Sequence, residues 1–416
     1  MRRTVPQERD AIADSTRRRR PNWLAGLFVA MLAIGTDEFV IAGVLPQIST
    51  DLAVSAAATG QLITAFAVAF AIGAPLLAVL TDRLPRRAVI VAALAVFALA
   101  NAAAALAPGY WPLLLARVAA ALAAALVASA AFALAAGNAP DGKQGHYLSV
   151  VTVGLTAALF TGVPVGTWLG GAYGWRATFW LLAGVGAIVA AAVAASAPAM
   201  PGTTPTPLAE RLAPLRALPV ARLMATTFLC GSGGLMFYSY LGPLTAALAD
   251  DSYQTLSLIL LLVGVTGVGA VFLGGRLTDA WGPRPARLLV IGGHGIALLG
   301  LAALAFSGTR SVTAFASLVA VWSVFAWALN PPMQASMLAA APNAGSTAMA
   351  LNISGLYLGS GVAGGLGGLI LATTSVAYPP LAAAALLLAA LALAAGRLTT
   401  ATAQPDRPPE TGRAPR

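Results

Sequence analysis

Apolar runs of about twenty residues recur along this chain of 416 residues, and each is long enough for a helix to cross about 30 Å of hydrocarbon. Such spans must be helices, because lipid-exposed backbone has to satisfy its own hydrogen bonds and barrel strands need only about 9–11 residues. We predict twelve spans, at residues 23–45, 58–80, 88–107, 112–136, 147–170, 176–197, 223–247, 256–276, 287–306, 312–338, 347–371 and 376–396.

Composition and charge placement agree with a membrane location. The chain is 59% hydrophobic and 9% charged, whereas about a quarter of the residues in soluble domains are charged. All but Arg117, Arg176 and Arg310 of the 24 Lys and Arg residues fall in segments that a twelve-span topology places inside. We therefore expect a multi-pass protein of the cytoplasmic membrane with both termini in the cytoplasm. The net charge of +10 at membrane edges favours lipid head groups over nucleic acid as a partner.

A repeat divides the apolar region into two. Leu80-Thr81-Asp82 recurs as Leu277-Thr278-Asp279, and the two aspartates are 197 positions apart (279 minus 82). Repeated membrane halves with a binding site at their interface are typical of secondary transporters. The sequence therefore predicts an all-α integral membrane fold, with twelve transmembrane helices in two six-helix repeats as in the major facilitator architecture.

Composition also marks the limits of these halves. Residues 200–207 are rich in Pro, Gly and Thr, as expected of a linker, and both ends of the chain are polar without apolar periodicity. We predict a disordered cytoplasmic tail at 1–20, an N-terminal six-helix half at 21–199, a cytoplasmic linker at 200–221, a C-terminal six-helix half at 222–397 and a disordered cytoplasmic tail at 398–416.

Three charged residues fall well inside the predicted hydrocarbon: Asp37 and Glu38 in the first span and Arg117 in the fourth. Glu38 and Arg117 lie at similar depths, roughly 10 Å and roughly 9 Å from the outer ends of their helices. An unpaired charge at mid-membrane costs at least about 2.5–3.5 kcal/mol, so these groups should face a partner, the bundle interior or a water-filled cavity. We expect Glu38 or Asp37 to take up and release a proton, with Arg117 nearby.

Neighbouring helix residues diverge by about 100°, so Asp37 and Glu38 cannot both face the same partner. Glu38 is our first choice for the proton carrier. The alternative is a permanent ion pair that only locks the first and fourth helices together.

Small residues form stripes in two spans. Gly154, Gly162, Gly166 and Gly170 share a four-residue repeat in the fifth span, and Pro164 should interrupt that helix. Either plain helix packing or a bent contact that gates exchange would explain the stripe. In the eleventh span, where seven glycines lie between residues 355 and 368, packing is the favoured interpretation.

Polar and aromatic residues within the spans are candidates to line a substrate cavity, because aromatic rings and Met suit apolar, variable ligands. These candidates are Gln61, Tyr238, Tyr240, Trp327, Asn330, Met333, Gln334, Asn352 and Tyr357. Each alone could equally serve helix packing.

The sequence predicts neither a metal site nor a cofactor. His146, His294 and Cys230 are too few and too far apart for a metal cluster, and His294 is expected to be a satisfied interior residue. No nucleophile–base pair and no phosphate-binding loop of the G-x-x-x-x-G-K-[ST] type is apparent, so we expect neither an enzyme nor an ATPase. Ion gradients are the remaining energy source.

Several motifs resemble the drug:proton antiporter branch of the major facilitator superfamily, over residues 23–396. The loop at 78–87 resembles G-x-L-a-D-r-x-G-r-k and matches it at Leu80, Asp82, Arg83, Arg86 and Arg87, with Ala78 and Pro85 replacing glycines. The fourth-span motif R-x-x-q-G keeps Arg117 but has Ala120 and Ala121. The fifth-span motif G-P-x-x-G-G is recognisable in Gly162-Val163-Pro164-Val165-Gly166 and Gly170-Gly171.

Within that branch, residues 35–40, Leu45-Pro46 and Gly73-Ala74-Pro75 are similar to arabinose-efflux-like and chloramphenicol-resistance-like permeases. That group often has a hydroxylated aromatic at the place of Phe66, which adds Phe66 to the cavity candidates. The resemblance assigns Arg117 to proton handling and implies a cytoplasmic gate formed by Asp82, Arg83, Arg86 and Arg87, with Asp279 and Arg284 in the second copy. The alternative for the loop is a charge cluster that only sets topology.

These patterns together predict proton-coupled efflux of a small, lipophilic compound, such as a drug or a chloramphenicol-like antibiotic, by alternating access. The expected partners are that compound, protons and the lipid bilayer, and we expect the protein to act as a monomer. A proton-coupled sugar or nucleoside exporter is the nearest alternative. A membrane-embedded enzyme and a non-transporting receptor or scaffold are less favoured.

Overall fold

A computed structural model describes residues 22–140, 144–202, 207–341 and 345–396 of the chain. Both predicted disordered tails lie outside these residues. Every element of regular secondary structure within the described ranges is helical. Among the described residues, twelve helical segments are long and apolar enough to cross a membrane, which confirms the predicted number of spans.

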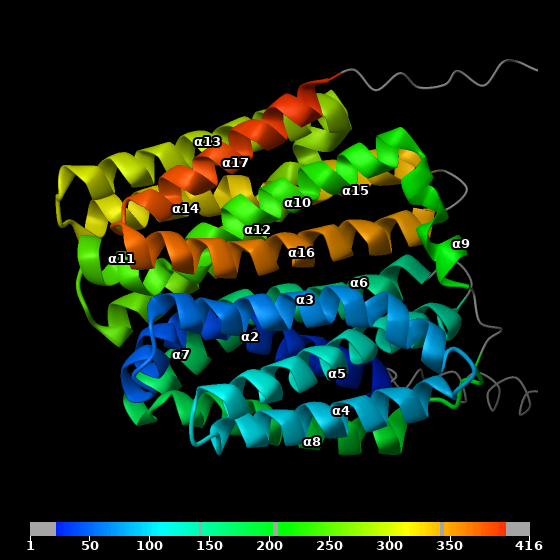
Figure 1. Ribbon diagram of the computed structural model, residues 1–416. Helices are drawn as coiled ribbons and strands as arrows, with labels where there is room; N and C mark the ends of the chain where they lie inside the picture. Colours follow the sequence, from blue (N-terminus) through cyan, green and yellow to red (C-terminus); the bar gives the residue numbers. More distant parts are fainter. Residues whose placement is uncertain (1–21, 141–143, 203–206, 342–344, 397–416) are drawn as a thin grey trace, which may run out of the picture.

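The helices form two bundles that lie side by side (Figure 1). We call the first bundle the N-terminal half; it consists of α2 (Asn22–Asp51), α3 (Ala56–Thr81), α4 (Arg86–Ala105), α5 (Tyr110–Gly137), α6 (Gln144–Phe160), α7 (Gly162–Tyr173) and α8 (Trp175–Ser196). The second bundle is the C-terminal half; it consists of α10 (Leu218–Ser239), α11 (Leu241–Leu248), α12 (Tyr253–Trp281), α13 (Pro283–Ser307), α14 (Val312–Ala328), α15 (Asn330–Ala340), α16 (Gly345–Thr373) and α17 (Tyr378–Ala395).

A linker that carries the short helices α9 (Leu208–Leu212) and η1 (Ala213–Arg216) connects the halves at one end of the molecule. We call this the linker end, and the other the opposite end. The first described residues of α2 and the last of α17 also lie at the linker end, as an even number of spans in each half requires.

Prolines break three of the spans. The helices α6, α10 and α14 end at Phe160, Ser239 and Ala328, each four residues before Pro164, Pro243 and Pro332. A proline ring clashes with the carbonyl group four residues earlier and removes one hydrogen bond, so a helix tends to stop there. Pro46 and Pro75 lie inside unbroken helices, so a proline alone does not decide where a span breaks.

Two sequence expectations are corrected at the ends of helices. The seventh span, predicted at 223–247, begins earlier and is divided into α10 and α11, because Pro243 breaks it. The Leu-Thr-Asp repeats, predicted to lie in turns, belong to the ends of α3 and α12. Asp82 caps α3, and Asp279 lies in the last turn of α12.

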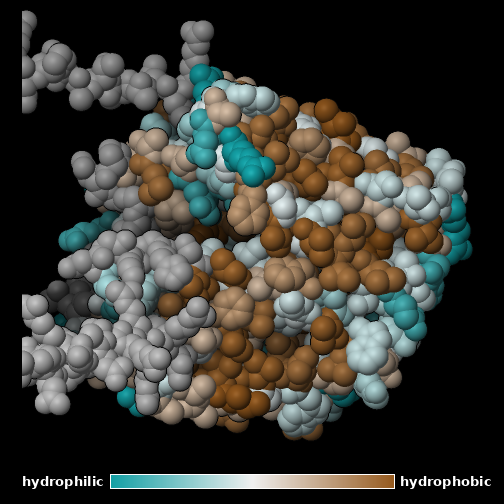
Figure 2. All heavy atoms as spheres, turned by 180° about the vertical axis from the view of Figure 1, so that it is seen from behind, coloured by the Kyte–Doolittle hydropathy of each residue, from teal (hydrophilic) through white to brown (hydrophobic). Residues whose placement is uncertain are grey.

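The surface between the two ends is apolar, as expected of a protein in lipid. Large side chains such as Leu99, Leu115, Ile188, Phe272 and Ile296 are each at least 70% exposed, and a hydrophobic band lies between more hydrophilic ends (Figure 2). Such an area would be unfavourable in water. The interior of α5 is formed largely by buried alanines, which let neighbouring helices approach closely.

The halves contact each other from the middle of the bundle to the opposite end. The Thr64 hydroxyl on α3 donates to the Gly361 carbonyl on α16 at 2.8 Å. The Ser257 hydroxyl on α12 donates to the Pro164 carbonyl on α7, also at 2.8 Å. Glycines on α16 allow its close contact with α3, since a Cβ at Gly364 would collide with the Gly60 carbonyl. The opposite end is therefore tightly packed.

Candidate functional site

Asp37 and Arg117 form an ion pair in the interior of the N-terminal half. Asp37 lies on α2 and Arg117 on α5, and their side chains are 0% and 1% exposed. Arg117 Nη1 binds Asp37 Oδ1, and Arg117 Nη2 donates to the Asp37 carbonyl oxygen at 3.1 Å. Each charge offsets part of the cost of burying the other. The pair joins two helices of the same half.

Aromatic rings cover the arginine of this pair. The Arg117 guanidinium carbon lies 4.3 Å from the centre of the Phe66 ring and 5.7 Å from that of Phe179, distances typical of cation–π contacts. Phe66, predicted to line a substrate cavity, instead covers Arg117. Asn101 on α4 lies beside Asp37 and was not among the predicted residues. A single asparagine in an alanine-rich span was the signal available in the sequence.

Glu38 faces away from Arg117, toward the C-terminal half. Its Oε2 accepts a 2.7 Å hydrogen bond from the hydroxyl group of Tyr357 on α16. The similar depths of Glu38 and Arg117 therefore do not make them partners, and Asp37 is the partner of Arg117. The 100° turn between helix neighbours directs one carboxylate into its own half and the other across the interface.

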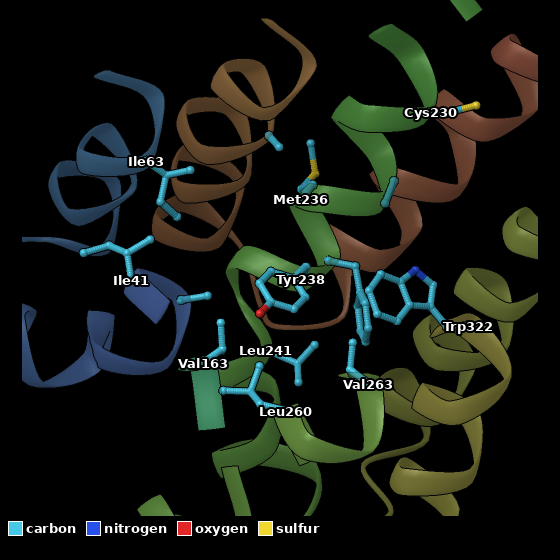
Figure 3. Packing of buried hydrophobic residues seen from close by; sticks show 14 of the residues in the cluster. Ile41, Ile63, Val163, Cys230, Met236, Tyr238, Leu241, Leu260, Val263 and Trp322 are labelled. Atoms are coloured by element: carbon cyan, nitrogen blue, oxygen red, sulfur yellow. The ribbon is translucent and has the colours of Figure 1, made fainter. Parts of the chain in front are cut away.

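Glu38 lines a small pocket between the halves. The pocket holds about the space of one water molecule, and its wall is formed by Glu38, Phe39, Ile41, Ala42, Ile63, Leu235, Tyr238, Ser239 and Ser360. Side chains of the two halves face one another beside it in Figure 3: Ile41, Ile63 and Val163 against Tyr238, Leu241 and Leu260. A drug-sized molecule would fit only after the halves move apart.

Aromatic rings from both halves meet at this pocket. The Phe39 ring contacts Tyr238 and Trp327 edge to face, with centroids 5.6 Å and 6.2 Å apart. Among the residues predicted to line a cavity, Tyr238 is thus one that lines this pocket. Large apolar rings around one carboxylate can bind lipophilic molecules of varied shape.

The two halves contribute different side chains to this pocket at corresponding positions of the repeat. Leu235 lies 197 positions after Glu38 (235 minus 38), the same spacing as between the two Leu-Thr-Asp copies, and both residues line the pocket. Pro46 and Pro243 show the same spacing. Gly234 correspondingly stands where Asp37 does in the first repeat. The N-terminal half therefore contributes both acids.

The other cavity candidates lie outside this pocket. Tyr240 is buried and donates to the Gly364 carbonyl within the C-terminal half, and Asn352 accepts a hydrogen bond from Thr227 there. Gln61 and Gln334 are exposed, and Asn330 is half-buried at the start of α15. Residue type alone could not distinguish these positions, because it does not tell which neighbour each helix face meets.

The glycine stripe of the fifth span packs against α2. Gly154, Gly162, Gly166 and Gly170 lie against Phe28, Thr36, Val40 and Val44, with a constant offset of 126 positions (162 minus 36). This parallel contact lies within the N-terminal half, so it matches the packing interpretation. The same contact positions the turn of α2 that carries Asp37 and Glu38. Pro164 lies at the break between α6 and α7 and contacts α12 through its carbonyl group.

Asp82 is the centre of a charge cluster at the linker end. Its Oδ1 accepts from Arg86 at 2.9 Å, and its Oδ2 accepts from Arg211 of α9 at 2.6 Å. The backbone N–H of Arg86 also donates to the Met200 carbonyl, so the linker is bound at a second point. Arg83 is exposed, and Arg87 donates to the Ala194 carbonyl. Arg211 was not predicted as a partner of Asp82.

The second copy of the motif has different contacts. Asp279 is exposed, and no ion pair to it is found within the part of the chain that the structure describes. Arg284 is exposed and donates to the Ala395 carbonyl at 2.9 Å. The two copies are thus alike in sequence and unlike in environment.

His294 departs from its expected state. Its side chain is buried on α13 beside Trp322, with ring centroids 6.0 Å apart, as predicted for an interior residue. Neither ring nitrogen finds a hydrogen-bond partner among the described residues, so it is not satisfied there. Gly234 leaves room for the ring but offers no polar side chain.

A protein-family model matches most of this chain. Residues 27–347 match the family model of the Major Facilitator Superfamily. A chloramphenicol resistance protein of Streptomyces lividans is 34% identical over 84% of this chain and 88% of its own length. YbcL of Bacillus subtilis (strain 168), an uncharacterised transporter of the same superfamily, is 31% identical over 84% of this chain and 89% of its own.

The fold is also found among solved structures. A bacterial homologue of the human lysosomal transporter Spinster, solved in an inward-facing and unoccupied conformation, superposes with a TM-score of 0.72. The match covers 91% of this chain and 97% of that one, at 17% sequence identity. This likeness concerns the fold.

Proposed function

The chain belongs to the Major Facilitator Superfamily, a family of membrane transporters and not of enzymes, and from that premise we propose that it exports a small lipophilic compound in exchange for protons. The observation that carries this proposal is the position of Glu38. It is a carboxylate in a pocket between the halves, next to a neutralised Asp37–Arg117 pair. Ionisable groups inside a membrane generally mark ion or substrate pathways.

Proton exchange would supply enough energy for export. One proton that crosses 100 mV releases about 2.3 kcal/mol, which supports roughly a fifty-fold gradient of a neutral solute. Glu38 is the proton site in this proposal, and Asp37 and Arg117 hold the adjacent turn of α2 in place. Arg117 is bound to Asp37, which leaves Glu38 as the exchangeable group in this proposal.

The pocket favours lipophilic substrates. Most of its wall is aliphatic or aromatic, and its aromatic rings come from both halves. The similarity to a protein named for chloramphenicol resistance supports a compound of that kind. Few directional groups and large apolar rings suit molecules that differ in shape.

Alternating access would use the two halves as rigid bodies. The gate at the linker end comprises Asp82, Arg83, Arg86 and Arg87, with Asp279 and Arg284 in the second half. Gly162, Pro164, Gly166 and Gly170 shape the bent α6–α7 contact. The charge network at Asp82 and the packed opposite end are what support this assignment.

Charge placement supports an orientation with the linker end in the cytoplasm. The junction of α3 and α4, the helix α9 and the start of α13 lie at that end (Figure 1) and carry Arg83, Arg86, Arg87, Arg211 and Arg284. Cytoplasmic loops are enriched in basic residues. We accordingly assign the protein to the cytoplasmic membrane with both termini inside. Each chain contains both halves of the pocket, so a monomer suffices for transport.

The test is a flux measurement in proteoliposomes. With an acid lumen and linker ends outward, radiolabelled chloramphenicol or ethidium should accumulate inside the vesicles. Glu38→Gln should abolish the pH-driven part, while Asp251→Asn, an exposed acid outside the spans, should transport like the wild type. Unchanged pH-driven uptake in Glu38→Gln would remove Glu38 from the mechanism.

A sugar or nucleoside exporter is the second candidate. Tyr238, Ser239 and Ser360 line the same pocket as Glu38, and such hydroxyl-bearing residues could bind a polyhydroxylated substrate. Arabinose and uridine belong in the same assay for this reason. Uptake of either one without chloramphenicol or ethidium uptake would favour this candidate. Absence of flux for all four compounds would contradict both proposed substrate classes.

A further inference from the structure

The neighbouring acids Asp37 and Glu38 have partners on different sides of the interface. Arg117, the partner of Asp37, belongs to the same half, so that bond is preserved when the halves move as rigid bodies. Tyr357, the partner of Glu38, belongs to the other half. We propose that Tyr357 couples the protonation state of Glu38 to the relative position of the two halves. This inference rests on the proposed function and adds to it a coupling residue.

Tyr357 is held in place for this role. Its side chain is 5% exposed, and its ring stacks on Phe70 of α3 with centroids 3.9 Å apart and an interplanar angle of 12°. The stack orients the hydroxyl group toward α2, where Glu38 Oε2 accepts its hydrogen at 2.7 Å. Phe70 belongs to the N-terminal half, so ring and hydroxyl group both bridge the interface.

Protonation changes the strength of this bridge. A hydroxyl group that donates to a carboxylate makes a charge-assisted hydrogen bond, roughly twice as strong as a bond between neutral groups. When a proton binds to the Glu38 carboxylate, the charge is lost and Tyr357 keeps its own proton, so a weaker neutral contact remains. The ionised form of Glu38 therefore favours the present arrangement, in which the opposite end is closed, and the protonated form favours it less.

The charged and titratable groups around Glu38 leave this sign unchanged. They are Asp37 on its own helix, Arg117 on α5, Tyr357 on α16 and Tyr238 on α10. The charges of Asp37 and Arg117 cancel within their pair. Glu38 is thus the charge that changes at the interface.

In an exchanger, this bond would hinder a change of conformation when neither substrate nor proton is bound. An unloaded, deprotonated transporter that changed conformation freely would let substrate leak down its gradient. The bond from Tyr357 holds that form with its opposite end closed. A proton on Glu38, or a substrate that displaces Tyr357, releases it.

Distances between spin labels at the opposite end test this proposal without a substrate. Labels at Leu106→Cys and Thr309→Cys, two exposed positions in different halves, would be placed in a Cys230→Ser background and measured in proteoliposomes from pH 9 to pH 5. The wild type should show mainly the short distance at pH 9 and a growing long-distance population at lower pH. Glu38→Gln should show no pH response.

Tyr357→Phe keeps the stacked ring and removes the hydroxyl group. Its ratio of long to short distances at pH 9 should rise about tenfold or more, since hydrogen bonds to charged groups change equilibria by that factor, and its pH response should shrink. Tyr110→Phe is the matched control, because that hydroxyl donates to the Ala58 carbonyl within one half; it should match the wild type. Glu38→Asp, which withdraws the carboxylate from Tyr357, should behave like Tyr357→Phe and serves if that variant does not fold.

Wild-type distances and pH response in both Tyr357→Phe and Glu38→Asp would overturn the proposal. If Glu38→Gln still lost the pH response, Glu38 would remain the proton site and only the role of Tyr357 would be wrong. A full wild-type response in Glu38→Gln would refute both the coupling and the proton site of the proposed function.

Discussion

Gly162 on α7 lies against Thr36 on α2, one residue before Asp37, so closely that any Cβ at position 162 would overlap the threonine side chain. We predict that Gly162→Ala forces these helices apart and destabilises the protein by about 1–3 kcal/mol, as overpacking generally does. Thermal unfolding in detergent measures this. Gly184→Ala is the control, because Gly184 on α8 has open space around it and should be neutral or slightly stabilising. Equal unfolding temperatures for both variants would contradict the packing role of Gly162.

The buried pair of Asp37 and Arg117 should show strong coupling. Asp37→Leu or Arg117→Met alone leaves one buried charge without its partner, which costs about 3–5 kcal/mol. The double variant removes both charges and should regain much of that loss. A double-mutant cycle built on thermal unfolding checks the prediction. Additive effects of the two substitutions would show that the residues do not depend on each other.

The two copies of the Leu-Thr-Asp motif should respond differently to the same substitution. Asp82→Asn weakens bonds to Arg86 and Arg211 and should cost about 1.5–3 kcal/mol, the usual range for hydrogen bonds to charged groups. Asp279→Asn changes an exposed side chain and should stay within about 0.5 kcal/mol of the wild type. The free energy of unfolding, measured by chemical unfolding, checks both variants. Adding Arg211→Gln to each of them shows whether the effect comes from the bond between Asp82 and Arg211 or from the loss of charge in general. If Arg211→Gln had the same effect in both backgrounds, the bond to Asp82 would contribute nothing.

Acid should loosen the start of α12. Hydrogen bonds from Ser252 and then Thr255 hold the pKa of Asp250, an exposed group outside the spans, below its usual value of 3.8. A group with a lowered pKa in the folded state contributes stability above its unfolded pKa and loses it as pH falls through the folded value. The protection factors of amides in the first turn of α12, which correct for the pH dependence of intrinsic exchange, should therefore fall below about pH 4, and more in the wild type than in Asp250→Asn. Identical profiles would contradict this assignment.

The amino-acid sequence by itself determined the elements of this protein. Hydrophobic length predicted twelve spans, and the described part of the chain contains twelve; the repeat predicted two halves. Pro164 was expected to interrupt the fifth span, and a break lies four residues before it. These features depend on interactions over a few residues, which a sequence shows directly: the hydrophobicity of a segment, the ring of a proline, the absence of a Cβ.

Only the tertiary structure decided which charges meet. Helix geometry showed that Asp37 and Glu38 diverge, but the pairing of Asp37 with Arg117 and of Glu38 with Tyr357 depends on how helices far apart in sequence are rotated against each other. Arg211 reaches Asp82 only because the linker folds back onto α3. Such partners are set by packing over distant helices, where a rotation of one helix by one residue position would exchange one neighbour for another, and no local pattern records that rotation.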